Sequence, residues 1–195
     1  MIGAVNPAPS AGISIGNAIS SIAEWLRQFT VRISSGNSHG SGVIWRSEGL
    51  IVTNAHVAHS QVHDVEFANG TKTQGWVLAR DRECDLAVMA VNLGGLPAAA
   101  VRSSANIRAG ELVIAVGNPW DGEGAVSAGI VHRPTNKPWV VADIRLAPGN
   151  SGGPLTDAEG NVVGINSMIV NGLGVAVGSD SVEAFLRRIH LAEAV

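Results

Sequence analysis

The segment Ala147-Pro-Gly-Asn-Ser-Gly-Gly-Pro-Leu155 holds the residues best suited to covalent chemistry. Acyl transfer needs an exposed nucleophile beside backbone N–H groups that can hold an oxyanion. Gly149 can adopt a backbone conformation that turns its N–H inward, and Gly152 and Gly153 leave room for a substrate. We therefore predict that Ser151 is a nucleophile.

Other interpretations of the same segment are weaker. A plain glycine turn between two strands is one alternative. The nucleophile elbow of α/β-hydrolases requires a helix directly after the serine and a catalytic histidine later in the chain. Ser151 is instead followed by Gly-Gly-Pro, and the only later histidine, His190, lies near the chain's end. A phosphate-binding P-loop is excluded because no Lys-Ser or Lys-Thr pair follows the glycines.

His56 follows the apolar stretch Leu50–Val52 and suits the role of general base, because histidine titrates near neutral pH. A competing hypothesis groups His56, His59 and His63 as zinc ligands on one helical face. The flanking residues favour strand and turn over helix, so His59 and His63, like His39, are interpreted as solvated loop residues. We expect no metal ion or other cofactor.

Asp85 begins an apolar strand, which suits an acid that must be shielded from water while it orients a histidine. Asp81 is the rival, but it sits in a polar turn. Cys84 is interpreted as a small buried residue without chemistry. The order His56, Asp85, Ser151 differs from that of subtilisins and α/β-hydrolases and is typical of the chymotrypsin-like class.

The elements that must position these residues are short strands. Two blocks of about six apolar runs, broken by Gly, Asn and Asp, predict an all-β sandwich or pair of barrels. The expected organisation is a flexible tail at 1–16, one domain at 17–195, lobes at 30–93 and 101–178 joined by a linker at 94–100, and a terminal helix at 180–192. Asp180 and Glu183 form a capping-box pattern at that helix. An earlier amphipathic helix is capped by Asn17 and carries an apolar stripe of Ile15, Ile19, Ile22, Leu26 and Phe29.

Composition limits the class of protein. The chain has 195 residues, of which 46% are hydrophobic, so it can bury a sizeable core, and its net charge of −3 gives no sign of nucleic-acid binding. One cysteine excludes an internal disulfide and favours a bacterial-type or intracellular design. No clear signal peptide is visible, which suggests a cytoplasmic protein as the sequence is written.

Several segments together resemble the HtrA (Deg) family of serine proteases. They are Gly40-Ser-Gly-Val-Ile44, Leu50-Ile-Val-Thr-Asn-Ala-His-Val57, Asp85-Leu-Ala-Val88, Gly117-Asn-Pro119, Pro148-Gly-Asn-Ser-Gly-Gly-Pro-Leu155 and Gly164-Ile-Asn-Ser167. The resemblance implies two perpendicular six-stranded β-barrels of the trypsin-like fold, with the active site between them. The PDZ domain common in that family is not found in this sequence.

The resemblance also implies roles for individual residues. His56, Asp85 and Ser151 would form the catalytic triad. The oxyanion hole would be formed by Gly149, Asn150 and Ser151. The residues expected to line the substrate pocket are Leu146, Ala147, Asn166, Ser167 and Met168, of which 166–168 should also pair with the substrate backbone as a strand.

Two functions from different classes follow. The first is hydrolysis of unfolded or damaged proteins, as the family implies, with a cell-envelope or periplasmic location. The second is a non-catalytic holdase or peptide-binding module that uses the same cleft. The family further implies a homotrimer formed through the N-terminal segment, whereas general principles favour packing of the apolar stripe on the chain's own barrels.

Overall fold

A computed structural model of the chain describes residues 15–36, 38–117, 125–133 and 138–190. The first six strands are β1 (Thr30–Ser35), β2 (Ser38–Arg46), β3 (Leu50–Thr53), β4 (Val62–Glu66), β5 (Lys72–Asp81) and β6 (Leu86–Val91). The next six are β7 (Leu112–Gly117), β8 (Ala125–Arg133), β9 (Trp139–Asp143), β10 (Pro154–Thr156), β11 (Val162–Val170) and β12 (Leu173–Gly178). Helix α1 (Ile15–Gln28) precedes them, α2 (Ser179–Arg188) follows them, and a short 3-10 turn, η1 (Ser104–Asn106), lies between the two sets.

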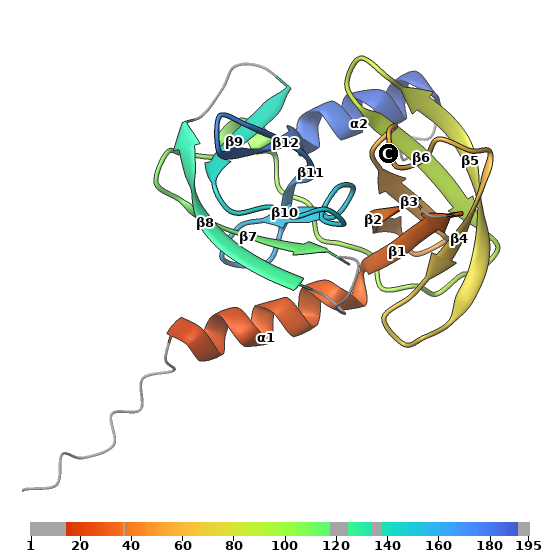
Figure 1. Cartoon of the computed structure of the whole chain (residues 1–195), viewed down its shortest axis with the longest axis horizontal. Helices are drawn as coiled ribbons and strands as arrows, with labels where there is room; N and C mark the ends of the chain where they lie inside the picture. Colours follow the sequence, from red (N-terminus) through yellow and green to blue (C-terminus); the bar gives the residue numbers. More distant parts are fainter. Residues whose placement is uncertain (1–14, 37, 118–124, 134–137, 191–195) are drawn as a thin grey trace, which may run out of the picture.

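The strands close into two antiparallel barrels within the described residues (Figure 1). The first has the order β1-β2-β3-β6-β5-β4 and the second the order β10-β11-β12-β9-β8-β7. Alternating apolar side chains fill each barrel, because successive residues of a strand point to opposite faces. The all-β prediction of two six-stranded barrels with a helix near each end is therefore confirmed.

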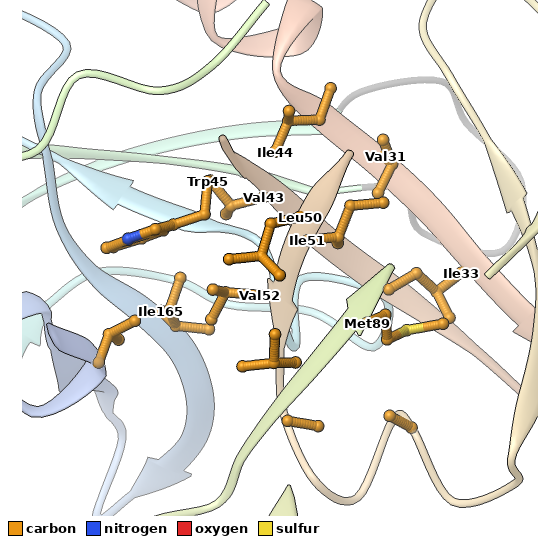
Figure 2. Packing of buried hydrophobic residues seen from close by; sticks show 14 of the residues in the cluster. Val31, Ile33, Val43, Ile44, Trp45, Leu50, Ile51, Val52, Met89 and Ile165 are labelled. Atoms are coloured by element: carbon orange, nitrogen blue, oxygen red, sulfur yellow. The ribbon is translucent and has the colours of Figure 1, made fainter. Parts of the chain in front are cut away.

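One apolar cluster joins the barrels. It fills the first barrel and continues through Ile114, Val116 and Ile165 of the second barrel to Phe185 of α2. Figure 2 shows Ile165 among the first-barrel residues of this cluster. Because the cluster is continuous, the two barrels share a dry interface and hold a fixed relative position.

The apolar stripe of α1 packs at its C-terminal end on the chain's own barrels, against β1 and β7. Leu26 is 0% exposed and Phe29 is 1% exposed, whereas Trp25 is 40% exposed and meets Phe29 edge to face. Leu26 and Phe29 therefore belong to the core, and Ile19 and Ile22 are partly buried against it. The helix begins at Ile15, so Asn17 lies inside it and is not its cap. The predicted flexible tail falls mostly on residues 1–14, outside the described residues.

Helix α2 differs from its predicted start. It begins at Ser179 after Gly178, and no side chain caps it. The Asp180 carboxylate instead accepts hydrogen bonds from Ser103, Ser104 and Ala105, and Glu183 accepts one of 2.8 Å from the indole N–H of Trp45. The predicted capping box is wrong, because tertiary partners of both carboxylates replace the local ones.

The helix ends at Arg188, short of the predicted residue 192. Among the described residues, neither helix is long and apolar enough to cross a membrane.

A stability measurement tests the place of α1 in the core. Phe29→Ala should lower the free energy of unfolding by about 3–5 kcal/mol, the cost of a large cavity in a packed core. Gln28→Ala, at the exposed last residue of α1 directly before Phe29, should change it by less than about 0.5 kcal/mol. Denaturant titration of both variants gives the comparison, and equal effects would show that α1 is not part of the core.

Candidate active site

His56 and Asp85 meet in the first barrel, each in a turn at a strand end. His56 follows β3 and Asp85 precedes β6, and these two strands are hydrogen-bonded neighbours. Nδ1 of His56 lies 2.9 Å from Oδ2 and 3.0 Å from Oδ1 of Asp85, and the backbone N–H of His56 donates to Oδ1 at 3.1 Å. A carboxylate accepts only, so Nδ1 carries the proton and Nε2 of a neutral ring is free to accept one.

Asp85 is held in an unusual backbone conformation. Its φ is 54°, in the left-handed region that residues other than glycine seldom occupy. The side-chain amide of Asn54 donates to the Asp85 carbonyl at 2.9 Å and supports this turn. Backbone outliers of this kind concentrate at functional sites, where surrounding contacts maintain them.

The second barrel contributes Ser167 to the same carboxylate. The register of β11 against β12 shifts between Asn166 and Met168, so Ser167 is the extra residue of a β-bulge. A bulge turns its residue away from the regular ladder. The Ser167 hydroxyl donates to Oδ2 of Asp85 at 2.5 Å, and its carbonyl accepts the hydroxyl of Ser151 at 3.2 Å. Ser167 was predicted to line the pocket and to pair with the substrate backbone, and the structure shows that it also links Asp85 to Ser151.

The electrostatics keep Asp85 ionised. Burial raises the pKa of Asp85, but the hydrogen bonds from His56 and Ser167, together with the charge of His56, lower that pKa below its usual range on balance. A carboxyl whose pKa is lower in the folded chain than in the unfolded chain stabilises the fold at pH values above its unfolded pKa. This stabilisation is lost as the pH falls through its folded pKa. The carboxylate therefore remains a hydrogen-bond acceptor into mildly acidic solution.

The loop that carries Ser151 is clamped on the first barrel through Ser41 of β2. The Ser41 backbone N–H donates to the Ser151 carbonyl at 2.8 Å, and its hydroxyl donates to the Gly149 carbonyl at 2.7 Å. Gly149 has a φ of 99°, which a residue with a side chain adopts only under strain. These contacts bring the serine loop of one barrel to the His56–Asp85 pair of the other.

Gly152 makes this close approach possible. A Cβ atom there would lie 2.0 Å from the Ser41 carbonyl oxygen and 2.2 Å from Oγ1 of Thr53. Thr53 in turn donates from Oγ1 to the same Ser41 carbonyl at 2.7 Å. Ser41 and Thr53 were not predicted as site residues, although both stand inside motifs that suggested the family.

The predicted oxyanion residues differ in their freedom to donate. The backbone N–H of Asn150 donates to the Ala147 carbonyl at 3.0 Å. That hydrogen bond shapes the loop and removes Asn150 from the predicted set of donors. The backbone N–H groups of Gly149 and Ser151 are left as the candidate pair.

The predicted pocket residues differ in their exposure and in their hydrogen-bond partners. Leu146 packs on the core of the second barrel and Ala147 is exposed, while Met168 is 42% exposed. Asn166 is only 1% exposed, and its amide donates to the Pro154 carbonyl at 2.8 Å. Its backbone N–H and carbonyl pair with Gly153 and Gly152. The prediction that Asn166 lines the pocket and pairs with substrate is wrong, because its side chain is buried and its backbone N–H and carbonyl are already paired behind the site.

Asp81, the rival of Asp85, is the last residue of β5, and Cys84 lies in the turn before β6. Asp81 forms an ion pair with Arg188 of α2 and accepts backbone hydrogen bonds from Glu83 and Cys84, and its pKa lies below the usual value although burial opposes the shift. Cys84 is half-buried rather than fully buried, and burial is the main cause that raises the pKa of its thiol.

The histidines of the zinc hypothesis do not converge on one point. His63 is 2% exposed in β4, where Nε2 contacts the backbone of Ser60, so its interpretation as a solvated loop residue is wrong. His39 lies half-buried in β2 rather than in a loop, whereas His59 is exposed as predicted. In the part of the chain that the structure describes, no three His, Cys, Asp or Glu side chains are grouped to hold a metal ion.

The arrangement of strands, loops and side chains has a counterpart in known proteins. The trypsin-like peptidase domain matches residues 40–165, a range that contains His56, Asp85 and Ser151. The chain belongs to the trypsin-like peptidase family.

Relatives of this trypsin-like peptidase carry the name that the motifs suggested. Serine protease HTRA4 of Homo sapiens is 36% identical over 165 residues, which cover 77% of this chain and 35% of that protein. Mitochondrial serine protease HTRA2 of Bos taurus is 36% identical over 77% of this chain and 36% of its own length. Serine protease HTRA1A of Danio rerio is 35% identical over 75% of this chain and 34% of its own length. The resemblance to HtrA serine proteases is therefore confirmed.

The trypsin-like peptidase chain spans about a third of the length of the curated relatives it matches. The three relatives named are animal proteins, so the bacterial-type design that the missing disulfides favoured stays a prediction.

Two glycines with the same φ separate the cost of backbone strain from the cost of a steric clash. Gly152 and Gly172 both have a φ of 82°, but a Cβ at Gly172 would meet nothing within 4 Å. Gly172→Ala should therefore cost only about 1–2 kcal/mol of stability, the price of the left-handed conformation. Gly152→Ala should lower the free energy of unfolding by more than this, because the new Cβ would also clash with Ser41 and Thr53, and it should displace the Ser151 loop. Thermal unfolding measures both, and equal costs would contradict the close approach at Ser41.

Proposed function

We propose that this trypsin-like peptidase is a serine endopeptidase in which His56, Asp85 and Ser151 form the catalytic triad. The observation that carries the proposal is one continuous set of hydrogen bonds. It runs from Nδ1 of His56 to the Asp85 carboxylate, from that carboxylate to the Ser167 hydroxyl, and from the Ser167 carbonyl to the Ser151 hydroxyl. It joins a base, an orienting acid and a nucleophile at the junction of the barrels.

The proposed reaction has two stages. Oγ of Ser151 bonds to the scissile carbonyl carbon while its proton passes to Nε2 of His56, and the N–H groups of Gly149 and Ser151 bind the oxyanion. The C–N bond then breaks, and His56 returns the proton to the departing amine. A water molecule, deprotonated by His56, next attacks the carbonyl carbon of the resulting ester. This step releases the carboxylic acid and restores the Ser151 hydroxyl.

Substrate binding would release the nucleophile. The Ser151 hydroxyl donates to the Ser167 carbonyl, so it must turn toward Nε2 of His56 before it can react. A substrate backbone N–H that pairs with the Ser167 carbonyl would take the place of this hydroxyl. The proposed reaction thus begins when an extended chain lies beside β11.

The shape of β11 favours an extended polypeptide as substrate. From Ser167 to Val170 it has β12 on one side and, among the described residues, no strand on the other. Such an edge can add a strand through backbone hydrogen bonds, which only unfolded or locally open proteins supply. Leu146, Ala147 and Met168 present apolar surface nearby, which favours cleavage after a small or medium aliphatic residue. Burying such a side chain contributes about 1.5–3 kcal/mol.

Substitution of the three residues tests the catalytic proposal. Ser151→Ala and His56→Ala should each lower casein hydrolysis by several orders of magnitude, because a triad acts as a unit. Asp85→Asn should reduce turnover about 10⁴-fold, since the amide favours the wrong histidine tautomer. Asp81→Asn is the matched control, and loss of activity there with retention in Asp85→Asn would move the acid to Asp81.

Labelling by a fluorophosphonate separates a peptidase from the alternative, a peptide-binding holdase. The wild type should become modified at Ser151, as mass spectrometry of the intact chain would detect, and a holdase should not react. Activity should also survive EDTA. Loss of activity on chelation, with recovery on addition of zinc, would favour metal chemistry at the histidines.

We further propose a homotrimer formed through the N-terminal segment, on the basis of the surface around α1. A cavity of about 490 Å³ lies between α1 and β8, and its lining combines apolar residues of both elements with Ser20, Glu24 and Arg27. Trp25 adds exposed apolar surface to the same helix. Apolar surface of this kind marks contact sites.

Truncation of the N-terminal segment tests the trimer. Removal of residues 1–20 spares Leu26 and Phe29, which the core requires, and should shift the mass found by light scattering from trimer to monomer. The mass of the full chain at micromolar concentration is the control. A monomeric full chain would contradict the proposal.

A further inference from the structure

A cavity beside the His56–Asp85 pair has no role in the chemistry described so far. Its volume is about 300 Å³, and it is lined by Ala55, His56, His59, Arg80, Arg82 and Asp85. Its walls are the turn after β3 that carries His56, the turn before β6 that carries Asp85, and the end of β5 that carries Arg80. A cavity of this size accommodates one or two amino-acid side chains.

The cavity carries an excess of positive charge. Among the described residues, neither Arg80 nor Arg82 has a carboxylate within ion-pair distance. The one carboxylate in the wall, Asp85, already accepts hydrogen bonds from His56 and Ser167. Nearby Asp81 is paired with Arg188. Both guanidinium charges of the wall are therefore available to an incoming anion.

The two arginines differ in how they are held. Arg80 donates through Nε to the Ala58 carbonyl and through Nη2 to the Ser60 carbonyl, which fixes its guanidinium along the wall. Arg82 lies exposed in the turn between β5 and β6 and can move to meet a ligand. A fixed cation beside an adjustable one suits a carboxylate, which binds guanidinium groups through paired hydrogen bonds.

The direction of a bound substrate points one side chain at this cavity. An extended chain beside β11 sends alternate side chains to opposite faces. In the proposed binding mode, the residue whose carbonyl meets Ser151 would turn its side chain toward Leu146 and Ala147 of the second barrel. The residue before it would then point the other way, toward His56 of the first barrel and the cavity that His56 lines.

We infer that this cavity is a subsite for an acidic side chain, Asp or Glu, of the residue preceding the one at the scissile carbonyl. The inference rests on the proposed endopeptidase function and adds a substrate class to it. Arg82, with Arg80, would determine specificity without taking part in bond cleavage. Partly exposed charge pairs have modest energies, so the expected preference is about three- to tenfold for Glu over Gln.

Matched peptides test the subsite. The series consists of fluorogenic peptides with Val at the scissile carbonyl and Glu, Gln or Lys before it, cleaved by the full chain. The kcat/KM ratio of Glu to Gln should be about three to ten, should fall as salt is raised, and should drop to about one in Arg82→Gln. Arg82→Glu should reverse the order so that the Lys peptide is preferred. Arg133→Gln, an exposed arginine of the other barrel, is the matched control and should keep the wild-type ratio.

A binding measurement separates this inference from the proposed function. Fluorescently labelled forms of the same peptides are titrated with the Ser151→Ala chain. The Kd should be lowest for the Glu peptide, higher for the Gln peptide and highest for the Lys peptide. Failure of the wild type to cleave any peptide, with the Kd order retained, would overturn the endopeptidase and support the subsite. Cleavage or binding that is equal for Glu, Gln and Lys peptides would overturn the subsite and leave the endopeptidase in place.

Discussion

The contact of Ser41 with the Ser151 loop is the constraint on which the rest of the site depends. The base and acid candidates belong to the first barrel and the nucleophile candidate to the second, so no single barrel holds all three. Two hydrogen bonds from Ser41 fix the loop across the junction. They can form only because Gly152 has no side chain to collide with the Ser41 carbonyl. The shared apolar cluster holds the barrels together, but apolar packing has no direction, and these polar contacts set the register.

Asp85 shows how the junction stabilises a partly buried charge. Its carboxylate would be costly if it were buried without partners. His56 from the first barrel and Ser167 from the second both donate to it, and their combined effect outweighs burial in its pKa. The β-bulge of β11 is what turns Ser167 toward it. The bulge, the left-handed turn at Asp85 and the glycine at 152 are therefore three local irregularities that serve one junction.

The surroundings of the site divide its tasks between the barrels. The second barrel supplies the open edge of β11 and the apolar residues beside Ser151. The first barrel supplies the cavity next to His56 with its two arginines. A polypeptide held between them would meet apolar surface on one side and positive charge on the other. Helix α2 ties the two sides together through Glu183 with Trp45 and Arg188 with Asp81.

The amino-acid sequence by itself determined the strand blocks, the order of the three candidate residues and the family. Alternation of apolar residues and the glycine-rich serine segment are local patterns, and local patterns survive without knowledge of the fold. Only the tertiary structure decided which polar groups meet. Asn166 could not be separated from Ser167 by sequence, because a one-residue bulge directs one toward the site and the other away. The sequence predicted that His63 lies in a loop, but it is buried in β4. The sequence also predicted a capping box at Asp180 and Glu183, but both carboxylates accept hydrogen bonds from residues distant in sequence. The physical reason is the same in each case, since a polar side chain binds its best partner in space and that partner is often far along the chain.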